Sequence, residues 1–154
     1  MCSRPTSGCR PAGLASPHRT ATTTITVTEL AEGSTFRVID EPPRTRSQRN
    51  PRFTSGDRLV FTNPLADAGG NRVGRLHAVC TITRGGRFTT AVVVCDGGHV
   101  LRKGALHVMV VSRLSGDTTD GSVVGGTGAY ANARGTFTSH NGEDDNRTTI
   151  TLVP

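Results

Sequence analysis

Aromatic residues and lysine are scarce in this chain of 154 residues. It contains no Trp, one Tyr and five Phe, and Lys103 is the only lysine among 18 basic residues. The formal net charge of +6 would suit a nucleic-acid partner. However, single-stranded bases are bound largely by stacking on aromatic side chains, and no RNA- or DNA-reading motif is present. We therefore expect no nucleic-acid partner.

Long hydrophobic runs are also missing. No stretch has the length of a membrane span or of a signal-peptide core. The sequence therefore predicts a soluble protein without a membrane partner, cytoplasmic by default, with secretion left open. Residues 1–22 are rich in Ser, Pro, Thr and Arg and are predicted to form a disordered tail, which leaves residues 23–154 as one folded domain.

The four cysteines lack the spacing of a metal site. Cys2, Cys9, Cys80 and Cys95 contain no pair separated by two residues, and no His lies at a matching offset. We therefore expect no metal.

Cys80 and Cys95 fall in consecutive predicted strands. A two-residue turn at Gly85-Gly86 would place Cys80 opposite Ala91 and Cys95 opposite Leu76. The two sulfur atoms would then lie about 13 Å apart, too far for a disulfide. This register predicts two free thiols.

Helical periodicity is almost absent, whereas Thr, Val and Gly are abundant, so the sequence predicts an all-β fold. Short alternating segments separated by turns favour an eight-stranded antiparallel up-and-down β-barrel. Thr35–Asp40 is taken to continue the first strand after a turn at Ala31–Ser34. The predicted segments are Thr23–Leu30, Thr35–Asp40, Asp57–Thr62, Val73–Thr83, Phe88–Cys95, Ala105–Ser112, Thr118–Val124, Arg134–Ser139 and Arg147–Val153.

Two strand boundaries follow from turn chemistry. Asn63-Pro64 is expected to end the strand that begins at Asp57, because proline has no N–H to donate to a ladder. Asp96-Gly-Gly-His99 is expected to form a turn.

Alternation is clearest in Val73–Thr83, and it places five side chains inside the barrel: Gly74, Leu76, Ala78, Cys80 and Ile82. The opposite alternation places the apolar residues Ile39, Val60 and Val79 on the outer wall, and the same hairpin register would add Val92 and Val94. Because a monomer rarely exposes so much apolar surface, we expect a homodimer or homotrimer.

A glycine-rich loop covers residues 125–135. It lacks the Gly-Lys-Ser/Thr ending of a phosphate-binding loop, and β-prone residues rather than a helix follow it. It is therefore predicted to be a structural turn that contains positive φ angles.

Several segments, taken in order, resemble a known family. Phe36–Glu41, the run Gly-Asp-Arg-Leu-Val-Phe-Thr-Asn at 56–63, and Val73–Thr81 are similar to allene oxide cyclases. Val124–Gly135 is similar to the Gly-Gly-Thr-Gly to Ala-Arg-Gly signature of the related dirigent proteins. The resemblance spans residues 23–154. It implies an eight-stranded barrel with a ligand cavity, usually oligomeric, that needs no cofactor.

The resemblance also implies roles for individual residues. Asn63, Phe61 and Cys80 match the family's cavity asparagine, aromatic residue and cysteine. Asp40 stands where the cyclases have an asparagine and dirigent proteins an aspartate. Val38 replaces the glutamate that plant cyclases use in epoxide opening, so the plant reaction on a fatty-acid allene oxide is not expected to carry over.

Asp40 and Asn63 are the predicted catalytic pair. A carboxyl group beside apolar residues can exchange a proton, and an amide can hold an oxygen or a water molecule. The structural alternatives are a solvated Asp40 at a strand end, a turn cap at Asn63, a carboxylate partner for Arg134 and a packing role for Cys80. The predicted substrate-binding residues are Val38, Phe61, Leu76, Ala78, Cys80, Tyr130 and Arg134.

Two function classes remain open. The first is a cofactor-independent cyclase or isomerase that folds a small hydrophobic substrate, of polyketide, lipid or phenolic type, in the barrel. The arginine excess is typical of a high-GC bacterial source and favours secondary metabolism. The second is a non-catalytic dirigent-type or ligand-binding protein. Polar residues at the reacting atoms would favour the enzyme, and a wholly apolar cavity would favour the binding protein.

Overall fold

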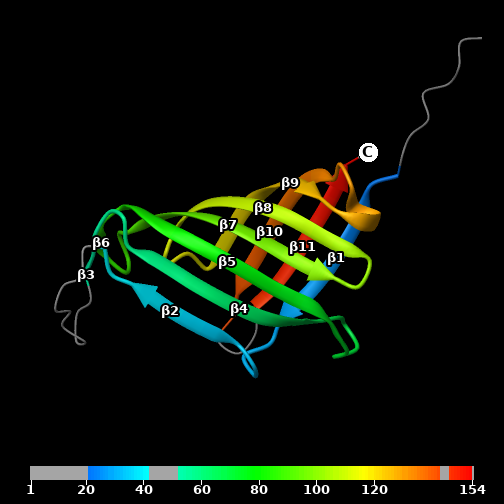
Figure 1. Cartoon of the computed structure of the whole chain (residues 1–154), viewed down its shortest axis with the longest axis horizontal. Coiled ribbons are helices and arrows are strands. Elements are labelled where there is room, and N and C mark those ends of the chain that lie inside the picture. Colours follow the sequence, from blue (N-terminus) through cyan, green and yellow to red (C-terminus); the bar gives the residue numbers. More distant parts are fainter. Residues whose placement is uncertain (1–20, 42–51, 143–145, 154) are drawn as a thin grey trace, which may run out of the picture.

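The chain forms a single antiparallel sheet that closes into a barrel (Figure 1). The computed structural model describes residues 21–41, 52–142 and 146–153. The predicted tail, residues 1–22, lies outside these ranges except for its last two residues. The strands are β1 (Thr23–Glu29), β2 (Thr35–Ile39), β3 (Arg52–Phe53), β4 (Arg58–Ala66), β5 (Arg72–Arg84), β6 (Gly86–Arg87), β7 (Val92–Leu101), β8 (Gly104–Arg113), β9 (Thr118–Gly126), β10 (Arg134–Asn141) and β11 (Asn146–Val153).

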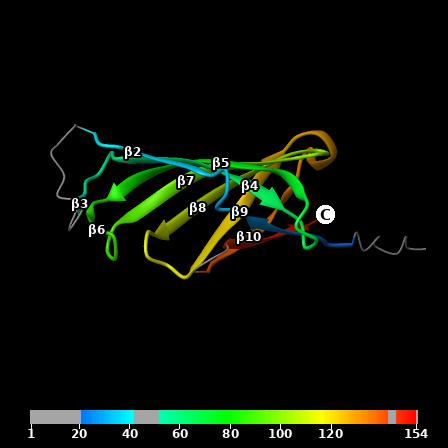
Figure 2. The same cartoon turned by 90° about the horizontal axis from the view of Figure 1, so that it is seen from below.

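Closure depends on how β1 and β2 share one edge of β4. The strand order is β1-β11-β10-β9-β8-β7-β5-β4-β2, and β1 also pairs with β4 through Thr28–Ala66 and Glu29–Leu65. β2 pairs with the other part of the same edge, so β1 and β2 form one strand interrupted by a turn, as predicted. The all-β, eight-stranded antiparallel barrel is confirmed. In Figures 1 and 2, β5 and β7 extend past β10 and β11 toward the short β3–β6 pair.

The predicted strand end at Asn63-Pro64 is wrong, because β4 continues to Ala66. Pro64 pairs with Arg75 of β5 on one side. On its other side the edge of β4 passes from β2 to β1, and the Pro64 carbonyl accepts a hydrogen bond from Leu30 N at 2.9 Å. No ladder partner there requires the N–H that proline lacks.

The prediction of free thiols at Cys80 and Cys95 is also wrong, because the two residues form a disulfide with Cα atoms 3.9 Å apart. Gly86 belongs to β6, and the chain turns after it, where Thr90 N donates to Arg87 O at 2.9 Å. A register shift between Ile82 and Arg84 further changes the pairing of β5 with β7 from the predicted register. Together they bring Cys80 directly opposite Cys95.

Inward-facing side chains of the strands form the core. The alternation predicted for β5 is confirmed, since Leu76, Ala78, Cys80 and Ile82 are all buried. The largest apolar group, here called the Leu106 cluster, comes from β8, β9, β10 and β11. It consists of Leu106, Val108, Val110, Val123, Phe137 and Ile150.

The glycine-rich loop is a short 3-10 turn over Gly128–Tyr130. Gly128 has φ of +60°, and a Cβ atom there would lie 2.5 Å from the carbonyl oxygen of Lys103. Glycine is required at this position by both the angle and the close approach. In the described ranges, no helix is long and apolar enough to cross a membrane.

Candidate active site

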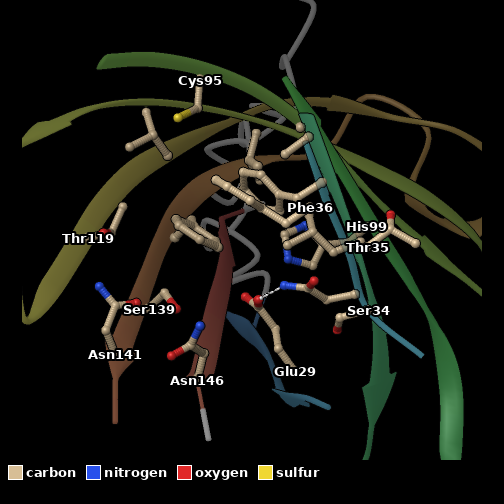
Figure 3. Close-up of a pocket in the computed structure, with 18 residues that line it drawn as sticks. Glu29, Ser34, Thr35, Phe36, Cys95, His99, Thr119, Ser139, Asn141 and Asn146 are labelled. Atoms are coloured by element: carbon tan, nitrogen blue, oxygen red, sulfur yellow. Dashed lines mark hydrogen bonds between the residues drawn. The ribbon is translucent and has the colours of Figure 1, made fainter. Parts of the chain in front are cut away.

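A cavity of about 370 Å³ occupies part of the barrel interior (Figure 3). Aromatic and aliphatic side chains form most of its wall: Phe61, Leu76, Ala78, Val108, Val110 and Phe137. The polar lining residues are Glu29, Ser34, Thr35, Asn63, His99, Thr119, Ser139, Asn141 and Asn146. Figure 3 shows Glu29, Asn141 and Asn146 together at one end of the pocket and Cys95 at the other.

Glu29 ends β1 on the face that points into the barrel. Val27 precedes it on the same face, and both are buried. The carboxylate accepts a hydrogen bond from Asn63 Nδ2 at 2.5 Å. The Thr148 hydroxyl lies 3.4 Å from the second carboxylate oxygen and 3.1 Å from Ser139 Oγ. Glu29, Asn63, Ser139, Asn146 and Thr148 are called the Glu29 cluster below.

The environment of Glu29 favours the protonated form. Desolvation by burial raises the pKa of Glu29 above its ordinary 4.5, although hydrogen bonds from Asn63, Asn146 and Thr148 oppose the shift. A carboxyl group with a raised pKa can donate a proton or a hydrogen bond closer to neutral pH than an exposed one.

His99 is the second ionisable side chain that lines the cavity. It lies in β7 between Leu76 of β5 and Leu106 of β8, and it is fully buried. Its ring packs against Phe137 with centroids 5.6 Å apart. Neither ring nitrogen has a hydrogen-bond partner among the described residues. Desolvation lowers the pKa of His99 from 6.5 to about 4, so the imidazole is neutral at physiological pH.

The predicted turn at Asp96–His99 is wrong, because β7 runs through it. Gly97 and Gly98 pair with Ala78 and His77 of β5. The glycines are part of a regular ladder, and the strand continues through them to place His99 inside. The prediction of a turn at Gly97-Gly98 is therefore the reason that His99 is not among the predicted cavity residues.

Four of the predicted site residues line the cavity: Asn63, Phe61, Leu76 and Ala78. Asn63 is the predicted catalytic residue that meets a buried carboxyl group, but its partner is Glu29 rather than Asp40. Asp40 is half-buried after the end of β2 and is not among the described residues that line the cavity. Its catalytic role stays a prediction.

The other predicted binding residues do not line this cavity. Cys80 is buried in the disulfide, and its partner Cys95 reaches the cavity instead. Val38 of β2 pairs with Leu59 of β4 and, within the described ranges, is not among the residues that line the cavity. Tyr130 packs against the Leu106 cluster, and the exposed Arg134 donates to the carbonyl of Ala133 at 2.8 Å. Their substrate contacts stay predictions.

Glu29 was missed although the sequence contains a signal for it. Ile25, Val27 and Glu29 alternate along the predicted first strand, so the acidic residue shares a face with two apolar residues. Ser139 shows the same alternation on β10, two residues after the inward Phe137. Thr148 shows it on β11, two residues before the inward Ile150. Such polar residues at inward positions are the pattern that marks the cluster.

No metal-binding group of three or more His, Cys, Asp or Glu occurs within the described parts of the chain. The polar groups that face the cavity are one carboxyl, one neutral imidazole, amides and hydroxyls. This set can hold oxygen atoms and exchange a proton.

Comparison with known proteins identifies the fold. No protein-family model matches the chain, and no curated protein sequence matches it significantly. Among solved structures, a pyocyanin demethylase matches with a TM-score of 0.64 and 20% identity over 85% of this chain and 100% of that chain. A pterocarpan synthase dirigent protein matches with a TM-score of 0.59 and 14% identity over 86% and 82%.

A third match is AbnU, an exo-specific intermolecular Diels-Alderase. Its TM-score is 0.62 at 12% identity, over 86% of this chain and 98% of that chain. The chain therefore has the barrel fold that dirigent proteins and these enzymes share, as its resemblance to the allene oxide cyclase and dirigent families predicted.

Proposed function

We propose that the protein is a cofactor-independent cyclase or isomerase that closes a ring stereoselectively in a reactive hydrophobic substrate. The observation that carries this proposal is the buried carboxyl group of Glu29, which faces an apolar cavity while Asn63 fixes its orientation. Similarity in fold to a Diels-Alderase and a demethylase supports an enzymatic role.

The apolar wall contributes by positioning. A flexible substrate held with its reacting ends together loses little further entropy in the transition state, and this effect alone can supply several kcal/mol. Phe61, Phe137 and Val108 provide a rigid surface against which such a substrate can fold.

Glu29 contributes chemistry at one end of the cavity. In its protonated form it can donate a hydrogen bond to a carbonyl or epoxide oxygen and stabilise negative charge that develops there. Asn63 holds one carboxyl oxygen, and Thr148 lies beside the other. The carboxyl group is therefore oriented before the substrate binds, so little reorganisation is needed.

A dirigent-type role without catalysis is the second candidate. It is favoured by the largely apolar surface of the cavity and by the similarity to a dirigent protein. In this case the barrel would only orient an intermediate that another enzyme produces. A source in bacterial secondary metabolism suits either role and remains part of the proposal.

A synthetic linear triene that carries an enone tests the proposal, because it cyclises slowly without protein. The rate and the enantiomeric excess are measured for the native protein, Glu29→Gln and Asp40→Asn. Glu29→Gln should lower turnover at least about tenfold, which corresponds to roughly 1.4 kcal/mol of transition-state stabilisation. Glutamine keeps the size and can still accept a hydrogen bond from Asn63, so ligand affinity should change little.

Asp40→Asn is the matched comparison. A larger loss of turnover in Asp40→Asn than in Glu29→Gln would place the acid–base centre at Asp40, as the sequence predicts. Full enantiomeric excess in both variants, with loss only on Phe61→Ala, would support the dirigent-type role.

A further inference from the structure

The two ring nitrogens of His99 are buried polar atoms whose hydrogen bonds are unmade within the described structure. A buried group in this state is destabilising relative to one whose hydrogen bonds are made. Nearly all buried polar groups in native proteins have a partner, whether protein, water or ligand. Because His99 lines the cavity, a molecule held there can supply a hydrogen-bond partner.

The described neighbours that flank His99 on the sheet or pack against its ring supply no hydrogen-bonding side chain. Leu76 and Leu106 lie directly opposite it on the two flanking strands, and Phe137 packs against the ring. The side chains of all three consist only of carbon and hydrogen. A neutral imidazole carries one N–H donor and one acceptor nitrogen, so it can give one hydrogen bond and receive another.

The charges of the lining residues restrict the charge that a ligand can carry. No Lys or Arg is among the described residues that line the cavity, although the whole chain has a net charge of +6. The ionisable side chains there are Glu29 and the neutral His99. A carboxylate or phosphate in this cavity would lose its water without gaining a cation, which is strongly unfavourable.

We propose that the cavity takes an uncharged, largely apolar molecule that has at least one hydroxyl or carbonyl oxygen, and that His99 recognises this oxygen. The aromatic wall binds the apolar body, and the volume of about 370 Å³ lies near the lower end of the range for ligand sites. This inference names the substrate class of the proposed enzyme and rests on the cavity being its substrate site.

Three naphthalene derivatives of similar size test the ligand class by isothermal titration at pH 7. They are 1-naphthol, 1-methylnaphthalene and 1-naphthoate, which differ in having a hydroxyl, a methyl or a carboxylate group. The native protein should bind 1-naphthol at least about tenfold more tightly than 1-naphthoate. His99→Phe should weaken 1-naphthol binding about tenfold and leave 1-methylnaphthalene binding unchanged or stronger.

His77→Phe is the matched control, because His77 is exposed on the outer face of neighbouring β5. It should leave all three affinities unchanged. His99→Gln retains a donor and an acceptor, so it should keep more of the preference for 1-naphthol than His99→Phe. If His99→Phe does not fold, His99→Leu takes its place in the comparison with His99→Gln.

Equal or tighter binding of 1-naphthoate by the native protein would overturn the inference. The same holds if 1-naphthol does not bind at millimolar concentration, or if loss of His99 weakens 1-naphthol and 1-methylnaphthalene equally. The assay needs no turnover. A His99-dependent preference without cyclisation would therefore refute only the proposed reaction, and cyclisation without that preference would refute only this inference.

Discussion

The Leu106 cluster and the Glu29 cluster lie side by side in the barrel and are supplied in part by the same strands. β10 contributes Phe137 to the first and Ser139 to the second, and β11 contributes Ile150 and Thr148 in the same way. Side chains two residues apart on a strand point to the same face, and their Cα atoms are about 7 Å apart. One step of alternation therefore separates an apolar core from a polar site.

The two clusters contribute differently to the free energy of folding. The Leu106 cluster buries hydrocarbon and contributes stability. The Glu29 cluster buries a carboxyl group, which costs free energy unless its hydrogen bonds are made. The first three predictions below test this difference and the last two test the barrel wall, from the largest expected effect to the smallest.

Leu106→Ala should reduce the free energy of unfolding by about 2–5 kcal/mol, because Leu106 is fully buried and the remaining cavity is only partly refilled. Ser139→Ala removes one hydrogen bond of the Glu29 cluster and should cost only about 1 kcal/mol. Urea denaturation of both variants measures the two losses. Equal losses would show that the two clusters do not differ in their contribution to stability.

His99 should make the protein sensitive to acid. Its pKa is lowered from 6.5 to about 4 in the folded state, so its contribution to stability is present above pH 6.5 and is lost as the pH falls toward 4. The full loss is about 3 kcal/mol. Denaturation of the native protein and His99→Leu across this range should show a flatter pH profile for the variant.

Glu29 should give the free energy of unfolding a pH dependence of opposite sign to that of His99, and the same experiment measures it. Its raised pKa means that stability is lost as the pH rises above 4.5 through the folded-state value. Glu29→Gln should remove this loss and leave the dependence below pH 6.5 that belongs to His99. Identical profiles for the native protein and both variants would argue against both burial effects.

The disulfide should stabilise the wall between β5 and β7. It closes a loop with a sequence separation of 15 residues, for which the chain-entropy model gives about 3 kcal/mol. Denaturation of the protein before and after reduction measures this contribution, and the Cys80→Ala/Cys95→Ala double variant is the control that reduction should not affect. Alkylation of both thiols in denatured, unreduced protein would instead show that the bond is not formed.

A charge on the outer wall should change assembly rather than folding. Val79 lies between the inward Ala78 and Cys80 and is 42% exposed. Val79→Lys should alter the unfolding free energy by no more than about 0.5 kcal/mol, because the new charge lies opposite Asp96 on β7. If the apolar outer wall forms the predicted homodimer or homotrimer, sedimentation should show the variant dissociating. A native protein that is monomeric at tens of micromolar would remove the oligomer prediction.

Local patterns were enough to predict the barrel. The alternation in Val73–Thr83, the interruption at Ala31–Ser34 and the turn at the glycine-rich loop depend on neighbouring residues in the chain. Strand preference, side-chain facing and positive φ are properties of this kind. The inward positions of Phe61, Leu76 and Ala78 follow from the same alternation, and so could that of Glu29.

Other features depend on contacts between distant segments. The β6 segment, which pairs with β3, and the bulge near Ile82 together shifted the register and joined Cys80 to Cys95. Neighbouring strands kept Gly97-Gly98 in a ladder and brought His99 inside. Most strands and the faces they present could be predicted from the sequence, because they depend on local geometry. Which inward residues meet depends on the folded barrel as a whole, because register is set by turns and bulges elsewhere in the chain.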